Sequence, residues 1–220
     1  MNYDQQDMKL KICEIFKSIQ GESSFVGWPC LFVRVSGCNM RCKYCDTNYA
    51  WNDGREMSIN EIIAEFSNLK GNLVLLTGGE PLLQQQTPVF LDRLIKLGYT
   101  TLVETNGSLD IAPLPADTVR IVDIKCPGSG ESERFYWDNL KNLRDCDEVK
   151  FVITDRSDFE WCKEFVLQSL FEFRGNILIS PAFGMIEPKE LVSWILESNL
   201  HLRFQLQLHK LIWGPHKRGV

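Results

Sequence analysis

Short apolar runs alternate with amphipathic stretches along this 220-residue chain. The apolar runs predict strands, and the stretches with an apolar residue at every third or fourth position predict helices. The expected strands cover residues 31–35, 73–76, 100–104, 120–125, 149–154, 176–180 and 202–208, and the expected helices cover 89–97, 159–170 and 188–197.

A further helix is expected directly after Ser58. Ser58 and Glu61 have the spacing of a capping box, in which each side chain accepts a hydrogen bond from the other residue's backbone. The apolar residues that follow fall on one face of a helix, namely Ile62, Ile63, Phe66 and Leu69. Local chemistry therefore fixes where this helix begins.

Alternating strands and helices imply a mostly parallel sheet with helices outside it. Polar signals follow several strands, at Cys38, at Thr77 to Pro81, at Thr105 to Gly107, at Lys125 and at Ser180. Active sites of α/β barrels lie at these strand ends, but a full barrel of eight units needs about 250 residues. The prediction is an α/β fold with a partial, open TIM-like barrel, forming one domain over residues 1–220.

Composition narrows the class of protein. Hydrophobic residues make up 44% and charged residues 24%, as in ordinary globular proteins. A net charge of -5 argues against a nucleic-acid partner. No apolar run reaches the roughly 20 residues that span a bilayer, and residues 1–7 lack the features of a signal peptide. We therefore expect a cytoplasmic protein without membrane contact.

Three cysteines, Cys38, Cys42 and Cys45, stand in a C-x3-C-x2-C pattern after the first expected strand. No fourth Cys or His nearby completes a tetrahedral zinc site. A 4Fe-4S cluster usually has four thiolates, so three leave one iron open to a second molecule. A zinc knuckle and incidental cysteines are the alternatives. The other five are interpreted as structural: Cys13, Cys30, Cys126, Cys146 and Cys162.

The cysteine triplet, Tyr44 before its last cysteine and the turn Gly78-Gly79-Glu80-Pro81 resemble the radical S-adenosylmethionine (SAM) superfamily. This resemblance implies that the three cysteines bind a 4Fe-4S cluster, whose open iron chelates SAM. Glycines let the backbone approach a ligand closely. The turn's carbonyls are then expected to accept hydrogen bonds from the SAM ammonium.

Further motifs narrow the resemblance to one family. Ser18-Ile19-Gln20-Gly21-Glu22, Cys45-Asp46-Thr47, Glu104-Thr105-Asn106-Gly107 and Gln207-Leu208-His209-Lys210 are similar to motifs of 7-carboxy-7-deazaguanine synthases. The family resemblance implies a lyase that converts 6-carboxy-5,6,7,8-tetrahydropterin to 7-carboxy-7-deazaguanine with loss of ammonia. This is a step towards queuosine and related 7-deazapurines.

The resemblance also implies roles for individual residues. Thr47 would bind a Mg²⁺ ion that also holds the substrate carboxylate. Residues expected beside the pterin are Ile19, Gln20, Gly21, Glu22, Arg34, Thr77 and His209. Residues expected beside SAM are Tyr44, Cys45, Asp46, Gly79, Asp123, Ile124, Lys125, Ser180, Pro181, Ala182 and Phe183. Some relatives carry Ser in place of Asp123 and Gln in place of Ser180.

Several of these side chains have plainer explanations. Thr47 could cap its own backbone, and Glu22 could be an ordinary exposed acid. Arg34 could point outward from its strand, although a buried arginine needs a partner and a substrate carboxylate would be one. A single histidine such as His209 is more often structural. The tail from Trp213 to Val220 could cover the pterin or be a solvated end.

The resemblance further implies an electron donor such as flavodoxin or ferredoxin, and a homodimer. Two other functions remain open at this point. A glycyl-radical-enzyme activase shares the cysteine spacing but acts on a protein. A zinc-binding regulatory module would have no catalytic activity.

Overall fold

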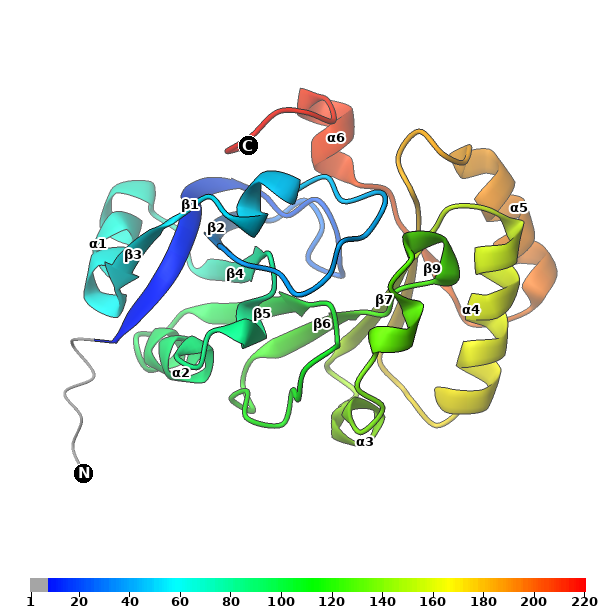
Figure 1. Ribbon diagram of the computed structural model, residues 1–220, viewed down its shortest axis with the longest axis horizontal. Coiled ribbons are helices and arrows are strands. Elements are labelled where there is room, and N and C mark those ends of the chain that lie inside the picture. Colours follow the sequence, from blue (N-terminus) through cyan, green and yellow to red (C-terminus); the bar gives the residue numbers. More distant parts are fainter. Residues whose placement is uncertain (1–7) are drawn as a thin grey trace.

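One mixed sheet forms the body of the protein (Figure 1). The computed structural model describes residues 8–220, so the segment 1–7, on which the signal-peptide expectation rested, lies outside the described residues. The strand order is β3-β1-β2-β4-β5-β6-β7-β8-β9. The strands are β1 (Lys9–Ile19), β2 (Pro29–Val35), β3 (Arg55–Ser58), β4 (Leu73–Gly78), β5 (Thr100–Thr105), β6 (Val119–Asp123), β7 (Glu148–Ile153), β8 (Asn176–Pro181) and β9 (Arg203–Phe204).

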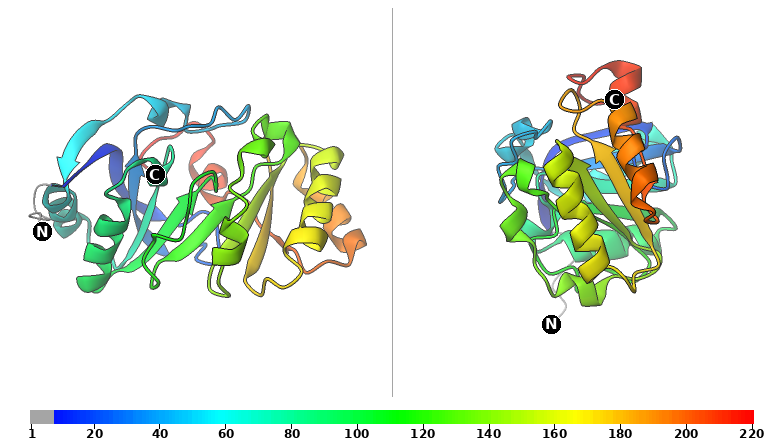
Figure 2. Two further views of the ribbon diagram at one scale, coloured as in Figure 1. Left: turned by 60° about the horizontal axis from the view of Figure 1, so that its bottom comes forward. Right: turned by 90° about the vertical axis from the view of Figure 1, so that its right-hand side faces the viewer.

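Most of the α-helices lie between strands along the chain, and the last one follows the last strand. They are α1 (Ile59–Leu69), α2 (Thr87–Lys96), α3 (Asn139–Asn142), α4 (Arg156–Ser169), α5 (Pro188–Ser198) and α6 (Leu208–Trp213). Figure 1 shows α4 and α5 together at the right-hand end of the sheet, and α6 and the C-terminal tail at the top of the view, above the strands. Figure 2 shows the same arrangement from two further sides. Within residues 8–220, no helix combines the length and the apolar character needed to span a membrane.

The predicted open, mostly parallel sheet is confirmed. Strand β2 pairs with β4 in parallel, and every neighbouring pair from β4 to β9 is also parallel. At the other end, β1 is antiparallel to both β2 and β3. The sheet has two ends, β3 and β9, and is therefore a partial barrel.

The prediction from neighbouring residues at Ser58 is confirmed, whereas the strands at the two edges of the sheet were predicted poorly. The capping box is present, since Glu61 Oε2 accepts from the Ser58 backbone at 2.6 Å and Ser58 Oγ accepts from the Glu61 backbone at 3.2 Å. The expected strand 202–208 is wrong in extent: β9 covers only Arg203–Phe204, and α6 already begins at Leu208. Residues 205–207 between them belong to neither a strand nor a helix. The antiparallel edge strand β3 was not predicted.

The two faces of the sheet carry hydrophobic clusters of different size. Residues such as Val33, Leu76 and Phe151 face the helices and join the large core. A small cluster on the opposite face contains Cys30, Phe32, Leu73, Leu75, Leu102 and Ile121. Strand residues alternate between faces, so the next inner position on each strand lies beyond this small cluster. Those positions are polar, and they form the floor of the site.

Candidate active site

A cavity of about 680 Å³ lies over the carboxyl ends of the parallel strands. The two-residue period of the strands brings the polar residues that follow the small inner cluster into its wall. They are Arg34, Thr77, Glu104, Asp123 and Lys150. Sheet register places Arg34 opposite Thr77 and Asp123 opposite Lys150. The sheet thus presents a row of hydrogen-bonding and charged groups to one ligand space.

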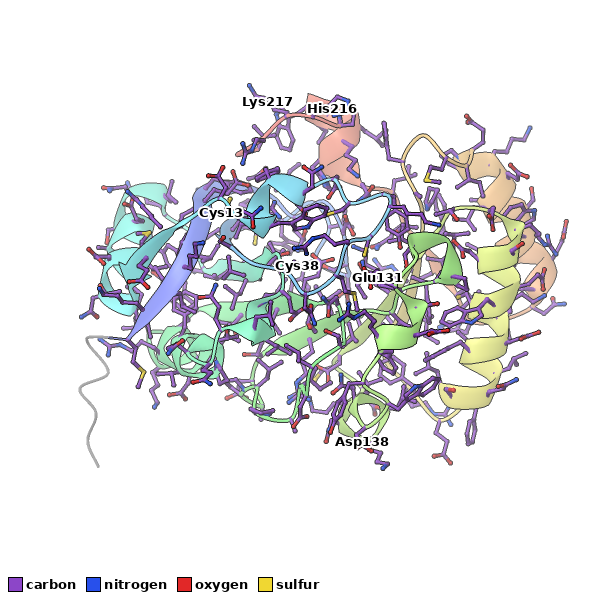
Figure 3. The ribbon with its side chains drawn as sticks, viewed as in Figure 1. Cys13, Cys38, Glu131, Asp138, His216 and Lys217 are labelled. Carbon is purple, nitrogen blue, oxygen red and sulfur yellow. The ribbon has the colours of Figure 1, made fainter. Side chains whose placement is uncertain are left out.

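The cysteine loop forms another wall of this cavity. Cys38, Cys42 and Cys45 all line it, together with Tyr44. The loop is held from outside: Lys43 donates its backbone N–H to the Ser129 carbonyl at 3.0 Å, and Arg41 donates its own to Glu131 at 2.6 Å. Figure 3 marks Cys38 and Glu131, which lie on the loop and on the segment that anchors it. The loop is therefore fixed by protein contacts.

The donor set fits an iron–sulfur cluster. Thiolates are the usual cluster ligands, and three thiols here line one cavity. The Cys38 sulfur lies 3.4 Å from the Met40 backbone nitrogen and 3.9 Å from Asn106 Nδ2, two donors that favour a thiolate. Burial raises the pKa of Cys38 and raises that of Cys42 to about 11, so binding iron would displace protons from these thiols.

Two observations concern ligands other than the cluster, namely a single metal ion and SAM. Among residues 8–220, no three His, Cys, Asp or Glu side chains are grouped closely enough to hold one metal ion. The Tyr44 hydroxyl and Asp123 Oδ1 are buried polar atoms with no hydrogen-bond partner in the described chain. Unpaired buried acceptors and donors are rare and call for an explanation. A ligand with several polar groups, such as SAM, would supply the missing partners.

The Gly78-Gly79 turn packs against the start of the cysteine loop. A Cβ at Gly79 would lie 1.8 Å from the Gly37 carbonyl oxygen. Gly78 has φ +131, and a Cβ there would lie 2.4 Å from Val35 backbone atoms. The backbone of Glu80 donates to the Gly37 carbonyl at 2.7 Å. Both glycines are required because two backbone segments touch here.

Glu80 ties this turn to the end of β5. Its carboxylate is fully buried and accepts hydrogen bonds from the Thr105 hydroxyl at 2.8 Å and from the Asn106 backbone at 2.7 Å. Asn106 in turn donates to Asn39 of the cysteine loop at 3.0 Å. Burial raises the pKa of Glu80. The residue has a bridging role that sequence analysis did not assign.

Lys150 lies among three acidic side chains. Its ammonium pairs with Glu22, lies 2.7 Å from Glu104 and lies 3.9 Å from Asp123. Glu22 also accepts from Gln207 at 2.9 Å. The simpler explanation of Glu22 as an exposed loop acid is therefore wrong. Sequence analysis missed Lys150 and Glu104, although a lysine inside an apolar strand is the same signal that singled out Arg34.

Arg34 points into the cavity wall and has a protein partner. Its Nε donates to Glu14 on β1 at 2.7 Å, and the Tyr49 hydroxyl donates to the same oxygen at 2.8 Å. The outward orientation considered for Arg34 is wrong. Its buried charge is satisfied without a substrate carboxylate, although its terminal amino groups make no hydrogen bond within residues 8–220.

Thr47 and Asp46 follow the last cysteine. The Thr47 side chain makes no capping hydrogen bond to the short helix it precedes, so the capping alternative fails. Its hydroxyl lies 3.8 Å from the Cys45 sulfur. Asp46 pairs with Lys210 at 2.5 Å, and although burial opposes it, the Lys210 ammonium lowers the pKa of Asp46. Thr47 thus presents a hydroxyl oxygen beside the cysteine loop.

Helix α6 and the tail close the cavity from the other side. A Cβ at Gly21 would lie 2.3 Å from His209 Nδ1, so glycine is needed for His209 to reach the cavity wall. Burial lowers the pKa of His209. The tail residues His216 and Lys217, labelled in Figure 3, also line the cavity. Arg218 stacks over Tyr49, 3.4 Å from the ring centre.

Most predicted site residues line the cavity, but four do not. These are Gly21, Ile124, Ser180 and Pro181. Ile124 faces the helices and belongs to the large core. Ser180 is fully buried and accepts from Gln205 at 3.0 Å, so Gln205 covers it. The remaining predicted residues at the cavity are Ile19, Gln20, Glu22, Arg34, Cys38, Cys42, Tyr44, Cys45, Asp46, Thr47, Thr77, Gly79, Asp123, Lys125, Ala182, Phe183 and His209.

The other cysteines are free thiols. Cys30, Cys126 and Cys162 are buried, as expected for structural residues, and Cys13 is half-buried. Cys146 is exposed, so it has no packing role in the core.

Comparison with known proteins identifies relatives over nearly the whole chain. Residues 32–122 match the model of the radical SAM superfamily. A 7-carboxy-7-deazaguanine synthase of Koribacter versatilis is 46% identical, covering 96% of this chain and 100% of the relative. One from Chlorobaculum tepidum is 42% identical, covering 96% and 97%. The crystal structure of QueE from Escherichia coli has the same fold, with a TM-score of 0.79 at 22% identity, covering 94% of this chain and 97% of that one.

Proposed function

The chain belongs to the 7-carboxy-7-deazaguanine synthase family of the radical SAM superfamily, and we propose that the cavity over the strand ends binds a 4Fe-4S cluster, SAM, Mg²⁺ and a carboxylated pterin together. The reaction is the conversion of 6-carboxy-5,6,7,8-tetrahydropterin to 7-carboxy-7-deazaguanine with loss of ammonia. The observation that carries the assignment is the meeting of the cysteine loop, Glu22 and Arg34 in one cavity.

The cofactors would occupy the side of the cavity formed by the cysteine loop. Cys38, Cys42 and Cys45 would hold the cluster, and Gly79, Asp123 and Lys125 would lie against SAM. When bound, the cluster and SAM supply the one-electron chemistry that removes a hydrogen atom from the substrate. The protein contributes binding, orientation and exclusion of water.

The other side of the cavity suits a pterin. Glu22 is an ionised acceptor for the N–H groups of the pterin's guanidine-like edge, since Lys150 lowers its pKa against the effect of burial. The terminal amino groups of Arg34 suit a carboxylate. Neutral His209 and the C-terminal tail would cover the ring. The opposite charges of Glu22 and Arg34 would orient the substrate before reaction.

Thr47 offers the clearest test of the magnesium assignment. A Thr47→Ala variant is expected to need roughly tenfold or more Mg²⁺ for half-maximal turnover, because a ligand to the ion is lost. Thr47→Ser keeps the hydroxyl and should respond like the wild type. Initial rates over a Mg²⁺ titration measure both variants. An unchanged response in Thr47→Ala would remove Thr47 from the metal site.

Metal analysis separates this function from the zinc-binding alternative. Protein purified without oxygen and reconstituted should contain iron and sulfide, and with SAM and dithionite it should release 5′-deoxyadenosine. A colourless protein holding zinc and no sulfide would rule out the radical SAM assignment for the cavity.

We also propose an electron donor, an oligomeric state and a cellular location for the protein. The electron would come from a small redox protein such as flavodoxin or ferredoxin, and the active species would be a homodimer, as the family resemblance suggests. One continuous sheet supports a single domain over the chain. Free cysteine ligands favour a reducing compartment, which supports a cytoplasmic location.

A further inference from the structure

Lys150 is a buried cation of the cavity, and binding of the cluster or SAM does not explain its role. Lys150 extends from the inner face of β7, and its side chain is 5% exposed. It faces carboxylates from three other parts of the chain: Glu22 from the β1–β2 connection, Glu104 on β5 and Asp123 on β6. An ammonium is stable at this depth only when such partners compensate it.

Of the three carboxylates, Glu22 is the one that lies outside a strand. Glu104 lies on a strand and also accepts from the Thr77 hydroxyl at 3.3 Å. Asp123 lies at the end of a strand and pairs with Lys125 at 2.7 Å. Glu22 is on a loop, where its Oε1 accepts from Gln207 and its Oε2 pairs with Lys150. The two oxygens of Glu22 are thus fixed by two side chains that are distant in sequence.

We propose that Lys150 is a positioning residue, which holds the Glu22 carboxylate in place to accept hydrogen bonds from the N–H edge of the pterin. The proposal rests on the proposed function, because it takes the pterin as the ligand of Glu22. Lys150 would thus influence which substrate binds, because it fixes the carboxylate of Glu22. A ligand edge with acceptors in place of donors would meet an ionised carboxylate and be rejected.

The charges around Glu22 give this idea a pH signature. The titratable groups that face Glu22 are Lys150 on β7 and His209 on α6. Burial acts to raise the pKa of Glu22, but the Lys150 ammonium lowers it, as does His209 once acid pH protonates that ring, so the net effect is a lowered pKa. Removing the Lys150 charge takes away the main effect that opposes burial, so the pKa of Glu22 rises. Pterin binding should then be lost as the pH falls through a higher value than in the wild type.

The direct test is a double-mutant cycle on pterin binding. The dissociation constant of 6-carboxypterin, an oxidised analogue, is measured by equilibrium dialysis against the reconstituted holoenzyme without reductant. Lys150→Gln is expected to weaken binding roughly 10- to 100-fold, the range for a lost hydrogen bond to a charged group. In a Glu22→Gln background the same change should cost less than about threefold, because the two residues act as one unit.

Lys150→Arg keeps the positive charge and guards against a misfolded neutral variant. Its acid limb of pterin binding should match the wild type, whereas that of Lys150→Gln should move up by about one pH unit or more. Lys163→Gln on α4, whose partner is Glu160, is the control for loss of a lysine charge. It should leave the dissociation constant unchanged.

The outcomes separate this inference from the proposed function. Equal costs of Lys150→Gln in the two backgrounds, or a shifted acid limb in Lys150→Arg, would overturn the role of Lys150. A wild-type holoenzyme that does not bind the pterin would instead overturn the proposed function, and the inference with it. Coupled losses with an unshifted Lys150→Arg profile support both.

Discussion

A Cys42→Ala variant is expected to lose SAM cleavage completely while keeping its fold. Cys42 lies on the cysteine loop and lines the cavity, and the side chain is only partly buried. Removing it leaves two of the three thiols that would hold the cluster, whereas the contacts that anchor the loop come from the backbone of Lys43 and Arg41. The measurements are iron and sulfide content and 5′-deoxyadenosine formed with SAM and dithionite.

The control for this variant is Cys146→Ala, which removes an exposed thiol outside the cavity. It should keep full iron content and full SAM cleavage. Measured without the cluster, thermal unfolding of both variants should resemble that of the cluster-free wild type, because a bound cluster would itself stabilise the folded state. If Cys42→Ala still cleaved SAM at the wild-type rate, the cysteine triplet would not be the cluster site.

Gly79→Ala should disrupt the same site from the opposite wall. The new Cβ would lie 1.8 Å from the Gly37 carbonyl oxygen, and a backbone neighbour cannot move aside as a flexible side chain can. Either the Gly78-Gly79 turn or the start of the cysteine loop must shift. We expect a loss of stability of about 1–3 kcal/mol, typical of overpacking, together with most of the bound iron.

Gly98→Ala separates these two effects. Gly98 has φ +87, so alanine there is strained, but a Cβ would meet nothing within 4 Å. This control should lose about 1–2 kcal/mol of stability, the usual cost of a left-handed residue, and keep its cluster. Iron content and thermal unfolding are measured side by side. Full iron content in Gly79→Ala would contradict the contact between the turn and the cysteine loop.

Sequence analysis recovered the site where local pattern determines geometry. The order of strands and helices placed Thr77 and Lys125 at one edge of the sheet, and both line the cavity, whereas Arg34 and Asp123 were assigned to the site by the family resemblance. The capping box of Ser58 and Glu61 depends on neighbouring residues alone, and it was also predicted correctly.

Contacts between distant segments could not be predicted in this way. The pairs Arg34 with Glu14 and Lys150 with Glu22 join different parts of the chain, and no short motif encodes them. Ser180 has the expected orientation, but Gln205 covers it. Successive strand residues point to opposite faces of the sheet, so Asp123 faces the cavity and Ile124 faces the helices and the large core. The two neighbours could therefore not both contact a ligand through their side chains. Neighbours in space decide these roles.

The most direct test of the account is turnover of the pterin itself. Reconstituted protein is incubated without oxygen with SAM, dithionite, Mg²⁺ and 6-carboxy-5,6,7,8-tetrahydropterin, and the products are identified by mass spectrometry, with Cys42→Ala as the blank. We expect 7-carboxy-7-deazaguanine and ammonia from the wild type and neither from the blank. Formation of 5′-deoxyadenosine without any deazapurine would contradict it, because the chain would then be a radical SAM enzyme for another substrate.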